Sequence, residues 1–182
     1  MIYGVISIII LVVAIVVVNY NSLVKLRQRT KNAWSQIDVQ LQKRYDLIPN
    51  LVEAVKAYAV HESTVFENIA KLRTTWVNAQ TIDDKNKADK QMGTALKSIM
   101  ALAESYPELK ANENFILLQT QLNDIESQIA FSRQFYNDTV TIYNTKIELF
   151  PSNIFAKIFG FQETTLYQIE AAQAKNNVRV EL

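Results

Sequence analysis

The sequence predicts an all-α protein: an N-terminal transmembrane helix continuing into an antiparallel up-down four-helix bundle, with a short Phe-rich helix after it. Three observations support this class. The chain begins with a long apolar run, later apolar residues recur at helical spacing, and only three Gly and three Pro occur among 182 residues. Strand-rich domains need many turns, and turns draw on Gly and Pro, so this composition favours helices.

Residues 1–24 are predicted to form a transmembrane signal anchor. No charged side chain precedes Lys25, and a helix of this length just crosses a hydrocarbon core about 30 Å thick. A cleaved signal peptide would carry basic residues before the apolar run and a small-x-small site after it, and neither is present. We therefore expect an uncleaved anchor. Its membrane-anchoring side chains are Ile2, Ile8, Ile9, Ile10, Leu11, Val12, Val13, Ile15, Val16, Val17 and Val18.

A basic cluster follows the anchor and predicts its orientation. Lys25, Arg27, Arg29 and Lys31 precede the first acid, Asp38, and no base lies before the apolar run. The positive-inside rule therefore predicts a single-pass cell-membrane protein with its N-terminus outside and the rest in the cytoplasm. These bases can also simply snorkel to lipid phosphates, and anionic headgroups of the inner leaflet favour both roles.

Composition limits the chemistry of the remaining domain. Its charge is nearly balanced, with 19 Lys and Arg against 18 Asp and Glu, which argues against a nucleic-acid-binding face. The chain has no Cys, so disulfides, thiol catalysis and Cys-ligated zinc are excluded. The residues after the anchor are numerous enough to build one domain with a hydrophobic core.

The bundle is predicted over residues 25–149. Pro49 should interrupt the first helix and start a tight reversal, because an interior proline removes a backbone hydrogen bond. Thr81–Lys90 has no apolar period, so we interpret it as a solvated loop leading into the third helix. The fourth helix carries a sustained a/d-like repeat typical of a bundle or coiled coil. The four helices are expected at about 25–47, 50–78, 85–106 and 109–149.

An amphipathic, Phe-rich element over residues 150–161 follows Pro151, and Gly160 is its expected C-cap. In an up-down bundle this element lies at the membrane-proximal end. We expect it either to contact the bilayer or a membrane partner, or to fold back as a hydrophobic cap on the bundle. The tail, residues 162–182, is expected to be helix followed by a short extended end. The side chains considered for the contact are Phe150, Ile154, Phe155, Ile158, Phe159 and Phe161.

No catalytic or metal-binding pattern is found. His61-Glu62 begins like the zinc motif HExxH, but the second His of that motif is replaced by Val65, and the chain has no other His. A di-metal bundle needs two Glu-x-x-His motifs, which one His cannot supply. No Ser–His–Asp arrangement or Gly-rich phosphate loop is recognisable. We expect no enzyme activity, cofactor or metal.

Polar residues near the helix faces admit two interpretations. The simpler one is that they cap helix ends and line solvated faces. The sharper one is that either Arg44 and Glu126, or Arg133 and Asp38, pair between helices and fix the register of the bundle, because buried charges need partners.

Two long stretches of the chain, and the Phe-rich element after them, resemble one known family. They are YNSLVKLRQRTKNAWSQIDVQLQKRYDLIPNLVEAVKAYAVHE (Tyr20–Glu62), YPELKANENFILLQTQLNDIESQIAFSRQFYNDTVTIYN (Tyr106–Asn144) and FPSNIFAKIFGF (Phe150–Phe161). These collinear segments resemble the LemA family. The resemblance implies a bacterial or archaeal membrane-anchored protein with an antiparallel helical bundle, and it implies no reaction.

These observations predict a non-enzymatic scaffold or adaptor that is anchored in the lipid bilayer and presents a cytoplasmic bundle to an unidentified protein partner. The alternative is a self-assembling, membrane-organising homo-oligomer, whose long Gln- and Asn-rich helices would pack between copies. Neither interpretation involves nucleic acid.

Overall fold

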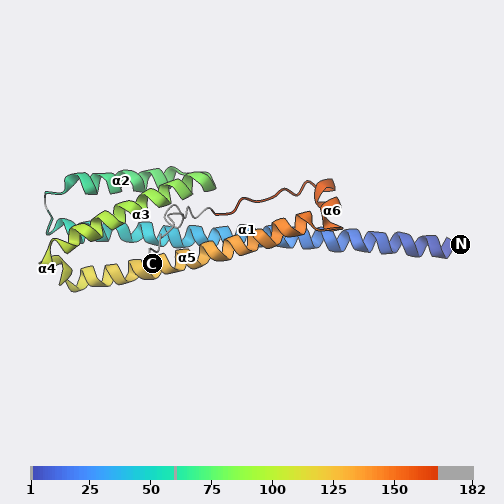
Figure 1. Ribbon diagram of the computed structural model, residues 1–182, viewed down its shortest axis with the longest axis horizontal. Helices are drawn as coiled ribbons and strands as arrows, with labels where there is room; N and C mark the ends of the chain where they lie inside the picture. Colours follow the sequence, from blue (N-terminus) through green and yellow to red (C-terminus); the bar gives the residue numbers. More distant parts are fainter. Residues whose placement is uncertain (1, 60, 168–182) are drawn as a thin grey trace, which may run out of the picture. The chain divides into compact units, whose positions relative to one another are not determined.

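The computed structural model describes residues 2–59 and 61–167, and these residues form six helices (Figure 1). No β-strand occurs in this described part of the chain, so the predicted all-α class is confirmed. In chain order the helices are α1 (Ile2–Lys56), α2 (Ser63–Asn78), α3 (Ile82–Glu104), α4 (Pro107–Lys110), α5 (Glu113–Glu148) and α6 (Ser152–Ile158).

The helices are grouped into two compact units. The first, here called the anchor unit, comprises Met1–Thr30 and Tyr136–Leu182, and the second, the bundle unit, comprises Lys31–Phe135. Helices α1 and α5 each contribute one part to each unit. The bundle unit therefore begins inside α1 and ends inside α5.

The bundle unit packs parts of α1 and α5 with α2, α3 and α4 around one apolar core. Successive long helices run in alternate directions within the unit, as expected for an up-down bundle (Figure 1). The α1 contribution follows the predicted spacing of three and four residues, which places one helix face inward. Buried core side chains include Ile37, Leu41, Tyr45, Ile48, Leu51 and Val55 of α1, Phe66, Ile69 and Trp76 of α2, Met92, Leu96 and Ile99 of α3, and Phe115, Leu122 and Ile129 of α5.

The predicted reversal at Pro49 is wrong, because α1 continues through this proline to Lys56. An interior proline costs roughly 3 kcal/mol of helix stability. Helical continuation allows Leu51 and Val55 to enter the core, and burying two such side chains outweighs that cost. The chain turns after Lys56 instead, where the amides of Tyr58 and Ala59 both donate to the carbonyl of Val55.

The third helix begins earlier than predicted, so most of the expected loop over Thr81–Lys90 is helical. Thr81 caps α3: its hydroxyl oxygen accepts from the amide of Asp84 at 3.1 Å and its hydroxyl donates to the Asp84 carboxylate at 2.6 Å. Such reciprocal capping starts a helix even where the apolar period is weak. Ala88 and Met92 then point into the core.

The fourth predicted helix is divided in two. Pro107 opens the one-turn helix α4, as proline at the first helical position commonly does. Asn112 then starts α5, because its side-chain oxygen accepts from the amide of Phe115 at 3.1 Å. The amide nitrogen of Asn112 donates to the hydroxyl of Tyr58 at 3.2 Å, which ties this corner to the turn after α1.

The anchor unit contains residues 2–30 of α1, the end of α5, helix α6 and the segment after it. Its small core consists of Leu23, Tyr143, Ala156 and Phe161, with Val24, Leu26, Ile147 and Phe155 packed against it. Gly160 has a φ of +69° and ends α6, as predicted for a C-cap glycine. Residues 162–167 are not helical, contrary to the predicted start of the tail, and residues 168–182 lie outside the described part.

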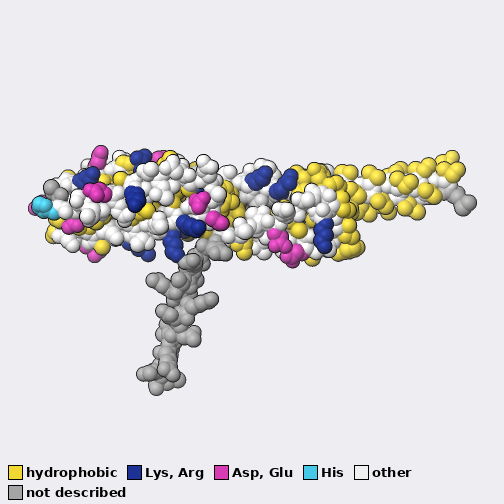
Figure 2. All heavy atoms as spheres, turned by 90° about the horizontal axis from the view of Figure 1, so that it is seen from above, with side chains coloured by type: hydrophobic (Ala, Val, Ile, Leu, Met, Phe, Trp, Pro, Cys, Tyr) yellow, Lys and Arg dark blue, Asp and Glu magenta, His cyan; other side chains and the backbone are white. Residues whose placement is uncertain are grey.

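Helix α1 contains a candidate membrane span at its N-terminal end. Within the described residues it is long and apolar enough to cross a bilayer, and none of the 18 residues in its most apolar window is buried. Figure 2 shows this part of α1 as a continuous run of apolar side chains. An exposed apolar helical stretch of this length agrees with the predicted anchor.

Candidate functional site

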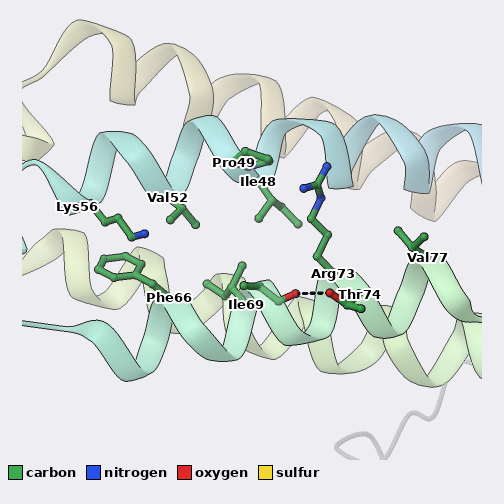
Figure 3. A pocket seen from close by; sticks show the side chains of 10 residues that line it. Ile48, Pro49, Val52, Lys56, Phe66, Ile69, Arg73, Thr74 and Val77 are labelled. Carbon is green, nitrogen blue, oxygen red and sulfur yellow. Dashed lines mark hydrogen bonds between the residues drawn. The ribbon is translucent and has the colours of Figure 1, made fainter.

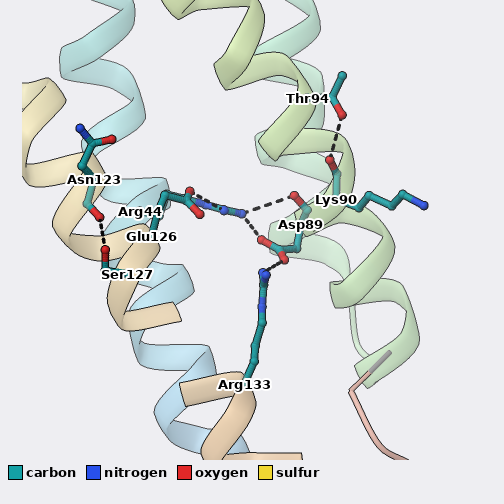
Figure 4. Close-up of polar contacts among 8 residues, drawn as sticks. All are labelled: Arg44, Asp89, Lys90, Thr94, Asn123, Glu126, Ser127 and Arg133. Carbon is teal, nitrogen blue, oxygen red and sulfur yellow. Dashed lines mark hydrogen bonds and ion pairs between the residues drawn. The ribbon is translucent and has the colours of Figure 1, made fainter. Parts of the chain in front are cut away.

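A buried network of charged side chains connects three helices of the bundle unit (Figure 4). Arg44 of α1 donates to both Asp89 of α3 and Glu126 of α5, the latter at 2.8 Å. Arg133 of α5 donates to the second carboxylate oxygen of Asp89. Arg44 and Asp89 are only 2% and 4% exposed, so their charges are removed from water and neutralised by each other.

The electrostatics of this network favour the charged state of Arg44. Burial by itself lowers the pKa of a guanidinium, but the negative charges of Asp89 and Glu126 outweigh it and raise the pKa of Arg44 above its ordinary value. Beside Arg44, burial raises the pKa of the Tyr45 hydroxyl, and the charge of Arg44 only partly opposes that shift. Tyr45 stacks on Trp76 of α2, with ring centroids 4.2 Å apart.

The two pairs considered from the sequence differ in outcome. Arg44 and Glu126 do form an ion pair between α1 and α5. Arg133 and Asp38 do not pair with each other: Arg133 contacts Asp89, and Asp38 contacts Lys85. Asp89 lies in the stretch Thr81–Lys90, where the absence of an apolar period gives no signal of a buried side chain. Whether the network fixes the register of the helices stays a prediction.

An open, mostly apolar groove lies between α1 and α2 of the bundle unit (Figure 3). It has a volume of about 540 Å³. Thr74 at its edge donates its hydroxyl hydrogen to the carbonyl of Ala70, so this hydroxyl is hydrogen-bonded within its own helix, α2. The lining residues are Ile48, Pro49, Val52 and Lys56 of α1, and Phe66, Ile69, Ala70, Arg73, Thr74 and Val77 of α2.

Two cations give the groove its electrostatic character. Lys56 extends over the ring of Phe66, with its nitrogen 5.3 Å from the ring centroid, and Arg73 lies on the opposite wall. The ten lining side chains include no carboxylate. The groove therefore offers apolar surface together with positive charge, a combination suited to an amphipathic ligand that carries an acid.

The Phe-rich element has an inner and an outer face in the anchor unit. Phe161 is buried and Phe155 is half-buried in the small core, as expected if the element caps its own helices. The remaining four predicted contact residues point outward. Those exposed side chains are Phe150, Ile154, Ile158 and Phe159.

A pair of Tyr-Asn dipeptides on α5 holds the segment after α6, residues 162–167, which we call the strap. The side chain of Asn144 donates to the carbonyl of Thr164 at 2.9 Å and accepts from its amide at 3.0 Å. Asn137 makes the same two bonds with Tyr167, at 3.1 and 2.8 Å. Each amide side chain thus binds one strap residue as a neighbouring β-strand would.

The adjacent tyrosines complete this arrangement. The hydroxyls of Tyr143 and Tyr136 donate to the carbonyls of Gln162 and Thr165, at 3.0 and 2.9 Å. The two dipeptides are seven residues apart on a helix, a rise of roughly 10.5 Å. Their contacts are three residues apart on the strap, and three extended residues span about the same length.

The sequence comparisons identify the family of the chain. The model of the LemA family matches residues 33–182. The chain belongs to the LemA family. This LemA chain is 27% identical to Magnetosome protein MamQ 2 of Paramagnetospirillum magneticum over 186 residues, covering 88% of the chain and 68% of that protein. Magnetosome protein MamQ of Magnetospirillum gryphiswaldense is 26% identical, with 84% and 66% covered. Protein LemA of Metamycoplasma hominis is 25% identical, with 89% and 72% covered.

Sequence reasoning missed two features of this LemA chain. The Thr-x-x-Asp pattern at Thr81 signals a helix start there, and a helix with this start carries Asp89 on the same buried face as Met92. The heptad repeat of Tyr-Asn, at residues 136–137 and 143–144, was visible as a regularity. The role of the repeat is to bind the strap, and the sequence of the strap shows no pattern that predicts this contact.

His61 is exposed on the bundle unit of this LemA chain, as a surface histidine would be. In the described residues no group of three or more His, Asp or Glu side chains lies in an arrangement that holds a metal ion.

Proposed function

We propose that this chain is a non-catalytic, single-pass membrane scaffold whose helical bundle binds protein partners in the cytoplasm. One observation carries the proposal: α1 combines an exposed apolar stretch with a buried one. None of the residues in its most apolar 18-residue window is buried, whereas Ile37 and Val55 of the same helix are completely buried in the bundle unit. A bilayer is the solvent that stabilises such an exposed apolar helix.

The state of the buried charges supports a structural role for the bundle. The carboxylate of Asp89 is held by two guanidinium groups, and Arg44 is held by two carboxylates. Groups bound in this way are neutralised inside the protein rather than presented to a substrate. Their arrangement links α1, α3 and α5, which keeps the outer faces of the bundle in defined positions.

The groove between α1 and α2 is the partner-binding surface that we propose. Its occupant is an amphipathic helix of another protein, with apolar side chains against Pro49, Val52 and Val77, apolar lining residues that are not buried. An acidic side chain of that helix lies near Lys56 or Arg73. Helix-in-groove recognition uses such apolar anchors and obtains specificity from flanking charge.

In-cell photocrosslinking tests this function. A photoreactive amino acid replaces Val77, which lines the groove and is 66% exposed, and in a matched control it replaces the exposed Leu117 of α5. We expect crosslinks to one other protein from position 77 and not from 117, with loss of this product in the Arg73→Glu variant. Crosslinks mainly between copies of the chain would contradict the adaptor and favour the self-assembling organiser.

The basic cluster Lys25, Arg27, Arg29 and Lys31 supports the orientation that we propose, with the N-terminus outside. Since the chain has no Cys, single cysteines report topology cleanly. Tyr3→Cys should react with a membrane-impermeant maleimide on intact cells, whereas His61→Cys should react only after permeabilisation. The reverse pattern would contradict the orientation, and equal labelling of both on intact cells would contradict the span.

A further inference from the structure

The anchor unit exposes an apolar patch around α6. Figure 2 shows apolar side chains gathered where α6 (red in Figure 1) meets α1. Phe150 is 79% exposed and Ile158 is 68% exposed, and their neighbours are also open to the surroundings. Contiguous apolar surface of this kind marks an interaction site. The patch consists of Leu149, Phe150, Ile154, Ile158 and Phe159.

Specific contacts hold α6 beside Asn19 and Tyr20 of α1. Ser152, at the start of α6, donates to the side-chain oxygen of Asn19 at 3.0 Å. At the other end, the rings of Phe159 and Phe161 pack edge-on against Tyr20, with centroids 4.9 and 5.9 Å away. These contacts place α6 beside the first polar residues that follow the apolar stretch of α1.

The same level marks the boundary between apolar and charged parts of α1. Val17 and Val18 are exposed apolar residues just before Asn19, and Lys25 and Arg27 are the first charges after it. Arg27 lies over the ring of Phe161, 4.8 Å from its centroid, so α6 is tied to the basic side of the boundary as well. In a membrane-spanning α1, this boundary coincides with the headgroup region.

We propose that α6 and the two residues before Pro151 form a second membrane contact, lying in the interface between acyl chains and headgroups. The division of α6 into faces fits this position. Ser152 and Ala156 are buried against the anchor unit, whereas Ile154 and Ile158 face outward. Lys157 is exposed beside them, and its long side chain can reach a lipid phosphate.

Lipid is the occupant that the surroundings favour. The apolar surface around α6 continues into that of α1 (Figure 2), and the exposed surface of α1 requires a bilayer under the proposed function on which this inference rests. Tyr20, at the junction, is the residue type enriched at membrane interfaces. The contact would fix the depth and rotation of α1, because a rigid side element cannot sink into or leave the interface without moving the helix.

Site-specific fluorescence in vesicles tests the contact. Full-length single-cysteine variants Ile158→Cys, Val77→Cys and Val12→Cys are labelled with an environment-sensitive dye and reconstituted into phosphatidylcholine–phosphatidylglycerol vesicles, with and without doxyl-labelled lipid. Positions 158 and 77 are matched, since their native side chains are 68% and 66% exposed. We expect a blue shift and quenching by doxyl lipid at 158, and neither at 77.

The label at position 12 separates failure of this inference from failure of the anchor. Lipid quenching at 12 with water-accessible dye at 158 would overturn the interfacial contact while the anchor stands. Dye at 158 that is shielded from both lipid and aqueous quenchers would also overturn it, in favour of a protein contact. No lipid quenching at 12 would overturn the anchor, and the inference with it. Ile154→Cys repeats the measurement if the variant at 158 loses helicity by circular dichroism.

Discussion

The bundle unit and the anchor unit differ in the polar groups that they enclose. The bundle unit buries charge, with Arg44 and Asp89 enclosed among apolar helices. The anchor unit buries Tyr136 and Tyr143, whose hydroxyls donate to the strap, while the strap-binding asparagines are only half-buried and Phe150 and Ile158 are exposed. In each unit, the packing of the interior has to supply partners for the polar groups that the unit encloses. The exterior of each unit reflects the medium that we propose for it.

Breaking the charge network should have the largest effect. Asp89→Asn removes the carboxylate that Arg44 and Arg133 share, and leaving buried guanidinium charge poorly compensated costs about 3–5 kcal/mol of unfolding free energy. Urea denaturation of the detergent-solubilised chain, followed by fluorescence of Trp34 and Trp76, measures this loss in the bundle unit.

Asp124→Asn is the matched control for Asp89→Asn, since Asp124 is exposed on α5. It should change the unfolding free energy by less than about 0.5 kcal/mol. Equal effects of the two variants would mean that the network adds nothing specific to the bundle.

Releasing the strap should have the next largest effect, and it should be confined to the anchor unit. Asn144→Ala removes the side-chain donor and acceptor that bind Thr164. The loss should lower the free energy of local unfolding of the strap by about 1–3 kcal/mol. Hydrogen exchange at the amide of Thr164 should accelerate roughly tenfold or more. Asn123→Ala, on an exposed part of α5, should leave this exchange rate unchanged. An unchanged exchange rate of Thr164 in Asn144→Ala would contradict the role of Asn144 in holding the strap.

Replacing one buried tyrosine in each unit should change the unfolding free energy by smaller and unequal amounts. The buried hydroxyl of Tyr45 makes no hydrogen bond of standard geometry among the described residues, whereas that of Tyr143 donates to the strap. Tyr143→Phe should therefore cost about 0.5–1.5 kcal/mol, and Tyr45→Phe close to nothing. Thermal denaturation of both variants, compared with the parent chain, tests the contrast. A larger loss from Tyr45→Phe would contradict it.

The same tyrosines make stability depend on alkaline pH. Burial raises the pKa of Tyr45, Tyr136 and Tyr143 above the ordinary value of 10.0. The folded state therefore keeps these protons at a pH where the unfolded chain has lost them. The contribution of these tyrosines to the unfolding free energy should be constant below about pH 10 and fall above it. Urea midpoints at pH 8 and pH 11, with tyrosinate absorbance at 295 nm, measure the fall, which Tyr45→Phe should reduce.

The pair between Lys85 and Asp38 should have the smallest effect. Both side chains are partly exposed, at 21% and 40%, so solvent and salt screen their attraction. Lys85→Met should cost less than about 1 kcal/mol, and the difference should shrink in high salt. A large, salt-independent loss would show that Lys85 acts mainly through its position above the ring of Trp76.

Helix faces were predictable from the sequence, but partners across helices were predictable only in part, since Arg44 pairs with Glu126 as considered while Arg133 and Asp38 have other partners. The spacing of Ile37, Leu41, Tyr45 and Ile48 indicates which side of α1 is buried, since helical period depends on local geometry. Whether Arg133 meets Asp38 or another acid depends on the rotation of each helix about its axis. Packing of the whole core sets that rotation, and no local pattern reports it.

The Pro49 error has a related cause. Local rules assign proline a cost but do not include the burial that follows if the helix continues. The corresponding gain comes from Leu51 and Val55, whose contacts involve other helices. In the Phe-rich element, the sequence likewise indicated an amphipathic helix over residues 150–161. It did not indicate which of its aromatic residues would face inward.

The strap has a consequence for how the chain tolerates substitution. Asn137 and Asn144 bind backbone atoms of Tyr167 and Thr164, not their side chains. Most side-chain replacements at Thr164 should therefore be accepted, and proline, which lacks the donated amide hydrogen, should be rejected. A saturation library at position 164 would therefore tolerate most side chains and reject proline. The same library at positions 137 and 144 would tolerate little besides asparagine, because no other residue has its length together with both hydrogen-bonding groups.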